Sequence, residues 1–337
     1  MKCKFATDAN RVFLFSVIVS QLMIYVIAGF GVNDIMVLQF LIQVFLALPA
    51  VLYLLGRQQP VTKSLGLTIP GIKEWLFLIP LAVCVDKIAE FINVVSQLFT
   101  RNEVSNHMIP LILQYPFPVA LFVIAVTPAI CEELVYRGVL FHNYRKTGLG
   151  IAVVLSGFLF GIMHMNLNQF SYGFVLGILL ALVNEITGSV LPSVFLHLYI
   201  NGRSVVMVHV IINQLRGLRE RYVAAESAQD TAGMEQLREL AGEIPIHSEQ
   251  WLEEYLNMES GNVGEMIVSL LPGFFTALLC ACVIFRFLLK IKKKKDAWGN
   301  GTSEIQNEKE TRGRWSRVLS PELFIGIGFC IVFMLIR

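Results

Sequence analysis

The hydrophobic pattern of the chain is a series of long apolar runs separated by shorter polar segments. A helix needs about 20 mainly apolar residues to cross a bilayer. The pattern therefore predicts an all-α, polytopic transmembrane helical bundle of about eight to nine spans. The predicted spans cover roughly 11–32, 34–56, 74–98, 117–145, 148–168, 171–188, 189–213, 263–289 and 321–336.

One long polar stretch, residues 214–262, lies between predicted spans seven and eight. It is rich in glutamate, and we expect an amphipathic extramembrane insertion with helix around 216–242 and 248–258. This stretch divides the chain into four parts. They are N-terminal transmembrane helices at 1–115, a core at 116–213, the insertion at 214–262, and C-terminal transmembrane helices with a basic loop at 263–337.

Composition agrees with this interpretation. Of the 337 residues, 55% are hydrophobic and only 15% are charged, whereas soluble domains contain about a quarter charged residues. A formal net charge of +2 gives no indication of nucleic-acid binding. We therefore expect a multi-pass integral membrane protein whose first partner is the lipid bilayer, and nothing in the sequence predicts its oligomeric state.

The basic residues predict the orientation of the bundle. Lys4 and Arg11 precede the first span, Arg145 and Lys146 follow the fourth, and a lysine run begins at Lys290. All of these fall on one side if nine spans are counted. Basic residues flanking spans face the cytoplasm. We therefore expect a plasma-membrane protein with a cytoplasmic N-terminus and an external insertion.

The fourth predicted span carries an unusual cluster of charges, Glu132, Glu133 and Arg137. Ionisable side chains at membrane depth are costly and mark candidate functional sites. Glu133 and Arg137 are four residues apart and can pair on one helix face. Glu132 points about 100° away, so it stays available as a base. Pro128 is expected to kink this helix and free a backbone carbonyl.

Two later spans carry histidines at a similar depth. At about 1.5 Å per residue, Glu132 lies roughly 20 Å from the basic end of its helix, and His164 lies roughly 24 Å from the same end. His197 and Asn201, which share a face, lie roughly 12 and 18 Å from the start of their span. We therefore expect these four polar groups to meet near the middle of the bilayer.

A known family matches this arrangement. The motifs EExxxR at 132–137, FxxxH at 160–164 and HxxxN at 197–201 resemble those of the CPBP family of CAAX-type prenyl endopeptidases and bacterial Abi-like intramembrane proteases. The resemblance covers roughly 117–203. It implies an intramembrane endopeptidase that hydrolyses a peptide bond in a membrane-associated or membrane-proximal protein or peptide. It also implies a helical fold whose polar cavity opens to the cytoplasm.

The resemblance also implies roles for the site residues. Glu132 and His164 would activate a water molecule, and His197 and Asn201 would stabilise the oxyanion. Glu133 and Arg137 would support the site. The family is often described as metalloproteases, and a divalent metal such as zinc held by Glu132, His164 and His197 is one alternative. No HExxH motif is present, and we favour a site without metal or other cofactor.

Other functions compete with this one. Ser156 lies eight residues before His164, too far for a direct pair on one helix, and neither a GxSG nor a GxGD motif occurs. A transporter could use the same buried polar cluster as a proton relay, but no internal repeat is visible. An immunity or scaffold protein without proteolytic activity is the remaining alternative.

Overall fold

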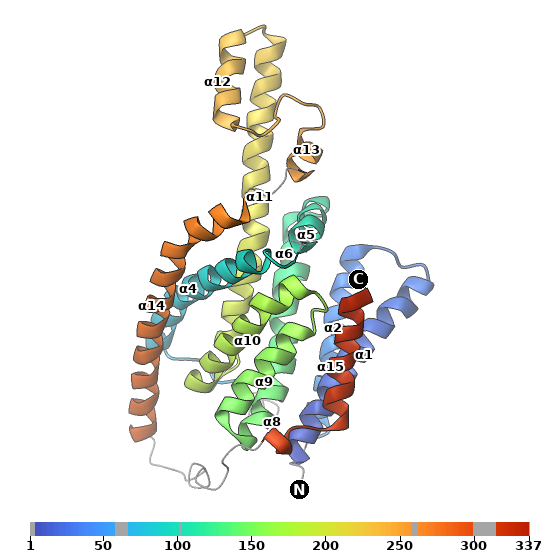
Figure 1. Cartoon of the computed structure of the whole chain (residues 1–337), viewed down its shortest axis with the longest axis vertical. Helices are drawn as coiled ribbons and strands as arrows, with labels where there is room; N and C mark the ends of the chain where they lie inside the picture. Colours follow the sequence, from blue (N-terminus) through green and yellow to red (C-terminus); the bar gives the residue numbers. More distant parts are fainter. Residues whose placement is uncertain (1–3, 58–66, 101–102, 258–261, 299–314, 337) are drawn as a thin grey trace.

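The structure of the protein is a computed structural model that describes residues 4–57, 67–100, 103–257, 262–298 and 315–336. No strand occurs among these residues, so the predicted all-α class is confirmed for the described chain. Helices pack side by side into a bundle, and a smaller helical hairpin projects from one end of it (Figure 1). The first helices are α1 (Lys4–Gly29), α2 (Ile35–Leu55), α4 (Ile72–Ser96) and α5 (Glu103–Gln114).

Contacts between distant segments define the end of the bundle opposite the hairpin, which we call the basic end. Asn10 near the start of α1 donates to the Val318 carbonyl at 2.7 Å and accepts from the Tyr144 hydroxyl at 2.6 Å. Arg145 pairs with Glu185 at 2.9 Å. The basic end therefore gathers the start of α1, the turn near residue 145 and the segment before the last helix.

The fourth predicted span is an interrupted helix. It consists of α6 (Phe117–Leu121), η1 (Phe122–Val126), α7 (Thr127–Glu133), η2 (Leu134–Phe141), α8 (His142–Tyr144) and η3 (Arg145–Thr147). The η1 and η2 segments are π-helical, a geometry that often occurs at functional sites. The expected disturbance near Pro128 is thus present as a wider helix.

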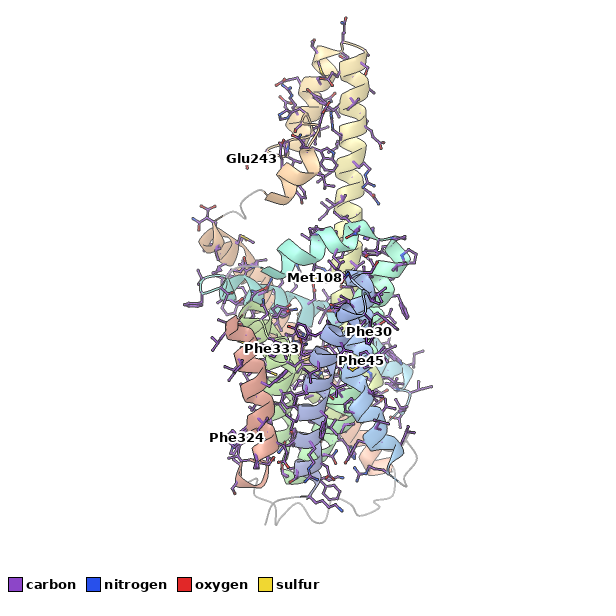
Figure 2. All side chains as sticks on the ribbon, turned by 90° about the vertical axis from the view of Figure 1, so that its right-hand side faces the viewer. Phe30, Phe45, Met108, Glu243, Phe324 and Phe333 are labelled. Carbon is purple, nitrogen blue, oxygen red and sulfur yellow. The ribbon has the colours of Figure 1, made fainter. Side chains whose placement is uncertain are left out.

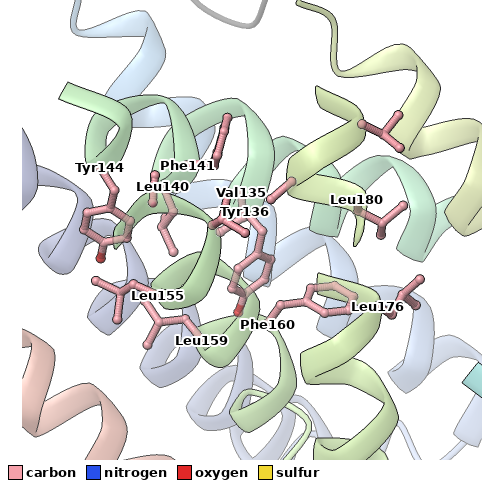
Figure 3. Close-up of a cluster of buried hydrophobic side chains, with 14 of the residues drawn as sticks. Val135, Tyr136, Leu140, Phe141, Tyr144, Leu155, Leu159, Phe160, Leu176 and Leu180 are labelled. Carbon is pink, nitrogen blue, oxygen red and sulfur yellow. The ribbon is translucent and has the colours of Figure 1, made fainter. Parts of the chain in front are cut away.

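Helices α9 (Leu149–Ile162) and α10 (Leu167–Thr187) approach each other very closely. A β-carbon on Gly177 would lie 2.7 Å from the Gly157 Cα, and one on Gly161 would lie 2.9 Å from the Phe170 carbonyl oxygen. Small residues at such crossings let two backbones meet inside a membrane. Beside this contact, a buried cluster of apolar side chains brings the edge of Tyr136 against Phe160 (Figure 3).

Helix α11 (Leu191–Ser227) runs without interruption from the bundle into the projecting hairpin. The hairpin is completed by α12 (Thr231–Ala241), followed by α13 (Trp251–Asn257). The predicted boundary at 213/214 therefore falls inside one helix. The arginine, glutamate and alanine residues after residue 215 have helix propensities as high as those of the apolar residues before it, so the helix continues. The helix expected over 216–242 is two helices, separated by a turn at Gln229, whose φ is 56°.

Two last helices complete the bundle, α14 (Val263–Trp298) and α15 (Pro321–Ile336), after the single turn η5 (Trp315–Arg317). Six described helices are long and apolar enough to cross a membrane, while α9 and α15 are apolar but shorter. Helix α4 is not among the six, and Asp86, Lys87 and Glu90 lie in it. The count of eight to nine spans is therefore not confirmed.

Candidate active site

A single cavity collects the four residues that the sequence predicts for the site. Its volume is about 440 Å³, and Glu132, His164, His197 and Asn201 all line it. These residues come from α7, from the turn after α9, and from α11. The predicted convergence of three separate segments on one space is therefore present in the structure.

Glu132 is held by a helix from the N-terminal part of the chain. The Gln43 side-chain amide of α2 donates a hydrogen bond of 2.9 Å to Glu132 Oε1. Both side chains are buried. Glu132 Oε2 has no hydrogen-bond partner among the described residues. Gln43 thus fixes one carboxylate oxygen of a residue that lines the cavity.

Glu133 and Arg137 form the predicted ion pair, at 2.7 Å, with both side chains fully buried. Arg137 also donates to the Gly177 carbonyl at 3.0 Å, and its guanidinium lies 4.4 Å from the centre of the Phe160 ring. Removing one partner of a buried ion pair typically costs about 3–5 kcal/mol. This pair therefore joins α7 and η2, and Arg137 links them to α9 and α10.

His197 lies between the two glutamates. Its Nδ1 is 2.9 Å from Glu133 Oε1, and its Nε2 is 3.9 Å from Glu132 Oε2. Nothing in the spacing of the sequence predicts the contact between His197 and Glu133. Because a carboxylate only accepts hydrogen bonds, Nδ1 carries the proton, and Nε2 faces Glu132 and the cavity. Glu133 thus supports the site through His197 as well as through Arg137.

His164 is oriented by its own helix. Its Nδ1 lies 2.8 Å from the Phe160 carbonyl oxygen, so this nitrogen donates. The other ring nitrogen, Nε2, is then an acceptor. The Phe160 ring contacts His164 and His197, with centroid distances of 5.3 and 5.6 Å. Phe160 is therefore the apolar spacer between the two histidines.

Asn201 faces the backbone that Pro128 disturbs. Proline has no N–H to donate to the carbonyl four residues earlier, which is that of Ile124. The Asn201 amide donates to this carbonyl at 3.4 Å, which is long for a hydrogen bond. A weakly engaged amide donor thus lies one helical turn from His197 on the same face of α11.

More charged groups lie farther along the cavity. Arg203 pairs with Asp86 at 3.3 Å, and Lys87 pairs with Glu90 at 2.6 Å. Lys87 and Glu90 are three residues apart on α4, so their side chains share a helix face. The partner of Asp86 comes from α11, which sequence spacing alone does not predict.

The sequence suggests Glu132, His164 and His197 as ligands if a metal is present. Within the described residues, no group of three or more His, Cys, Asp or Glu side chains is placed to hold a metal ion. Glu132, His164 and His197 share the cavity without forming such a cluster. Action without a metal therefore stays a prediction.

Sequence reasoning missed several residues of the site. Gln43 and Gln39 are two amides four residues apart in an apolar span, and polar residues inside a span are themselves a signal. Gly177 carries no such signal, because its role depends on the approach of α9. The sequence shows Phe160 only as the first residue of the FxxxH motif and does not predict its contacts with both histidines.

Residues 114–203 match the family model described as "Type II CAAX prenyl endopeptidase Rce1-like". This match supports the assignment of that segment to the CPBP family. The matched segment contains Glu132, Glu133, Arg137, His164, His197 and Asn201, and it supports a protease that is integral to the membrane. No curated protein and no solved structure matches the chain. Gln43 lies outside the matched segment.

Proposed function

We propose that this protein is an intramembrane endopeptidase in which Glu132 acts as general base toward a water molecule. The observation that carries the proposal is the convergence of Glu132, His164, His197 and Asn201 on one cavity. Gln43 fixes one oxygen of Glu132 and leaves the other without a partner among the described residues. Positioned acid–base groups of this kind typically accelerate proton transfer about 10²–10⁴-fold.

The proposed reaction begins with a water molecule held between Glu132 Oε2 and the acceptor nitrogen of His164. Glu132 takes a proton from this water, and the water oxygen attacks the scissile carbonyl carbon. The carbonyl oxygen gains the negative charge and faces Asn201 and His197. Glu132 then passes the proton to the leaving nitrogen as the C–N bond breaks, which yields a carboxylic acid and an amine.

His197 can stabilise the oxyanion only in its protonated form. Its Nδ1–H already faces Glu133, and donation from Nε2 requires the imidazolium, in which both ring nitrogens donate. Two glutamates flank the ring within 3.9 Å. Preorganised donors aimed at developing charge are a large source of catalysis.

The lining of the cavity favours a polypeptide substrate. Gln39, Asn93 and Gln169 contribute side-chain amides to it. An amide presents a donor and an acceptor, which complements the N–H and C=O groups of a peptide backbone. We therefore propose a membrane-associated or membrane-proximal protein or peptide as substrate, without assigning it a prenyl group.

Replacement of the proposed base tests the function. Glu132→Gln keeps the shape of the side chain and removes its basicity, so cleavage is expected to fall at least about 10²-fold. Membrane and released peptides from cells that make the wild type or Glu132→Gln identify the substrate. His142→Gln, on the same interrupted helix and away from the cavity lining, is the matched control. Full turnover by folded Glu132→Gln would refute the mechanism.

A separate experiment addresses the proposal that the site acts without metal. Purified protein treated with a chelator and analysed for bound metals is expected to cleave the identified peptide at the untreated rate. Loss of activity on chelation, with recovery on addition of zinc, would instead assign the activity to a metal-dependent enzyme.

A further inference from the structure

The position of the cavity along the bundle determines which side of the membrane it serves. The cavity lining comes from the half of each helix that points toward the hairpin. On α2, Gln39 and Gln43 lie roughly 6 and 12 Å from Ile35, at the hairpin end. On α10, Gln169 and Tyr172 lie within roughly 8 Å of Leu167, also at the hairpin end.

Helices that run from the basic end toward the hairpin end also place their lining residues near the hairpin. Helix α4 runs from the basic end toward the hairpin end, and Asp86, Glu90 and Asn93 lie in its second half. His164 lies two residues after Ile162, the last residue of α9. Met108 of α5 also lines the cavity, and Figure 2 shows it at the hairpin end, with Phe324 toward the opposite end. The cavity thus extends from Glu132 toward the hairpin.

The cavity is accessible along α11. Ser204 is exposed, and the Arg203 side chain is 32% exposed, although both residues line the cavity. Both lie farther toward the hairpin than His197. A polar route therefore leads from the catalytic groups to the hairpin end of the bundle.

Charge marks the other end of the bundle as cytoplasmic. Residues near the basic end include Lys4, Arg11, Arg57, Lys73, Arg145, Lys146 and Lys292. At the hairpin end, the described loops 30–34 and 163–166 contain no Lys or Arg. Basic residues close to the spans face the cytoplasm. The hairpin contributes four arginines, Arg216, Arg219, Arg221 and Arg238, against the seven basic residues named for the basic end.

We infer that the cavity opens on the extracytoplasmic side of the membrane. Its substrate class is then the extracytoplasmic segment of an exported or membrane-anchored polypeptide, which reaches Glu132 past Ser204. This inference rests on the proposed function for the cleavage step, but the side of access does not. It differs from the cytoplasmic opening that the family resemblance implies.

The labelling of one added cysteine at a time tests the side of access. Three substitutions in the full-length protein are compared in right-side-out and inside-out membrane vesicles. They are Ser204→Cys in the cavity, Asn33→Cys in the loop between α1 and α2, and Lys73→Cys at the basic end. A small membrane-impermeant methanethiosulfonate reagent is applied, and mass spectrometry quantifies each labelled peptide, so the native cysteines do not interfere.

Ser204→Cys and Asn33→Cys are expected to react at least about tenfold faster in right-side-out vesicles, and Lys73→Cys in inside-out vesicles. Reaction of Ser204→Cys from the same side as Lys73→Cys, or from neither side, would overturn the inference. Reversal of all three would also overturn it, because the cavity would then face the cytoplasm.

The labelling also separates this inference from the proposed function. The same measurements in a Glu132→Gln background need no proteolysis and are expected to be unchanged. If Glu132→Gln retains full cleavage while Ser204→Cys reacts from the outside, the mechanism fails and the side of access stands. If Glu132→Gln is inactive but Ser204→Cys reacts only from the cytoplasm, the mechanism stands and the inferred side of access fails.

Discussion

The family-matched core and the projecting hairpin differ in what holds them together, although α11 belongs to both. In the core, two helix backbones touch at Gly157 and Gly177, and a fully buried ion pair links three segments. The hairpin has only a small apolar core, formed by Tyr222, Leu237, Ala241 and Ile246. A chemical site needs fixed distances, which the tight core provides and the hairpin does not.

Substitution at the glycine contact is expected to have the largest effect. In Gly177→Ala, the new methyl group would lie 2.7 Å from the Gly157 Cα, so α9 and α10 must separate. We expect a loss of about 1–3 kcal/mol of stability together with a large loss of cleavage, because Arg137 binds the Gly177 carbonyl. Thermal unfolding in detergent and peptide cleavage measure both.

Gly150→Ala is the matched control for that substitution. Gly150 is on α9, and a β-carbon added there would have no neighbouring atom within 4 Å, so alanine is expected to be neutral or slightly stabilising. Equal losses in the two variants would show that close packing is not what distinguishes the core.

An intermediate effect is expected from Gln43→Leu, which removes the donor to Glu132 Oε1. A hydrogen bond to a charged group contributes about 1.5–3 kcal/mol. We therefore expect kcat to fall about tenfold or more while KM changes little. Steady-state kinetics on the identified peptide provide the measurement.

Gln39→Leu is the natural comparison for Gln43→Leu, since Gln39 lines the same cavity one turn earlier on α2. It is expected to raise KM and to leave kcat near the wild-type value. A fall in kcat of the same size in both variants would mean that Gln43 has no special relation to Glu132.

The smallest effect on cleavage is expected in the hairpin. Leu237→Ala removes a side chain that is 6% exposed, and such core truncations cost about 2–5 kcal/mol locally. Limited proteolysis should therefore cut the hairpin sooner, while cleavage of the peptide stays within about twofold of wild type. Loss of activity comparable with that of Gly177→Ala would make the hairpin part of the catalytic unit.

Local spacing predicted part of the site well. The pair between Glu133 and Arg137 follows from their four-residue separation, and depth matching along the helices predicted that Glu132, His164 and His197 would share one space. These relations depend on helix geometry alone, which sequence determines directly.

Relations between helices were harder to predict. The contact of His197 with Glu133 and that of Gln43 with Glu132 depend on how α11 and α2 rotate against α7, and packing sets that rotation. The prediction divided the chain at 213/214, whereas α11 continues through this point as one helix to Ser227. Hydropathy shows where the apolar residues end and not where the helix ends. The cytoplasmic opening came from resemblance alone and stays a prediction, which the cysteine labelling tests against the opposite side.

The uninterrupted course of α11 has a consequence for how its two ends are related. Successive residues of an α-helix are rotated by about 100°. Insertion or deletion of one residue between His209 and Arg216 would leave the catalytic face unchanged and swing the hairpin by about 100° around the helix axis. The direction in which the hairpin faces is thus set by the number of residues between it and the catalytic face.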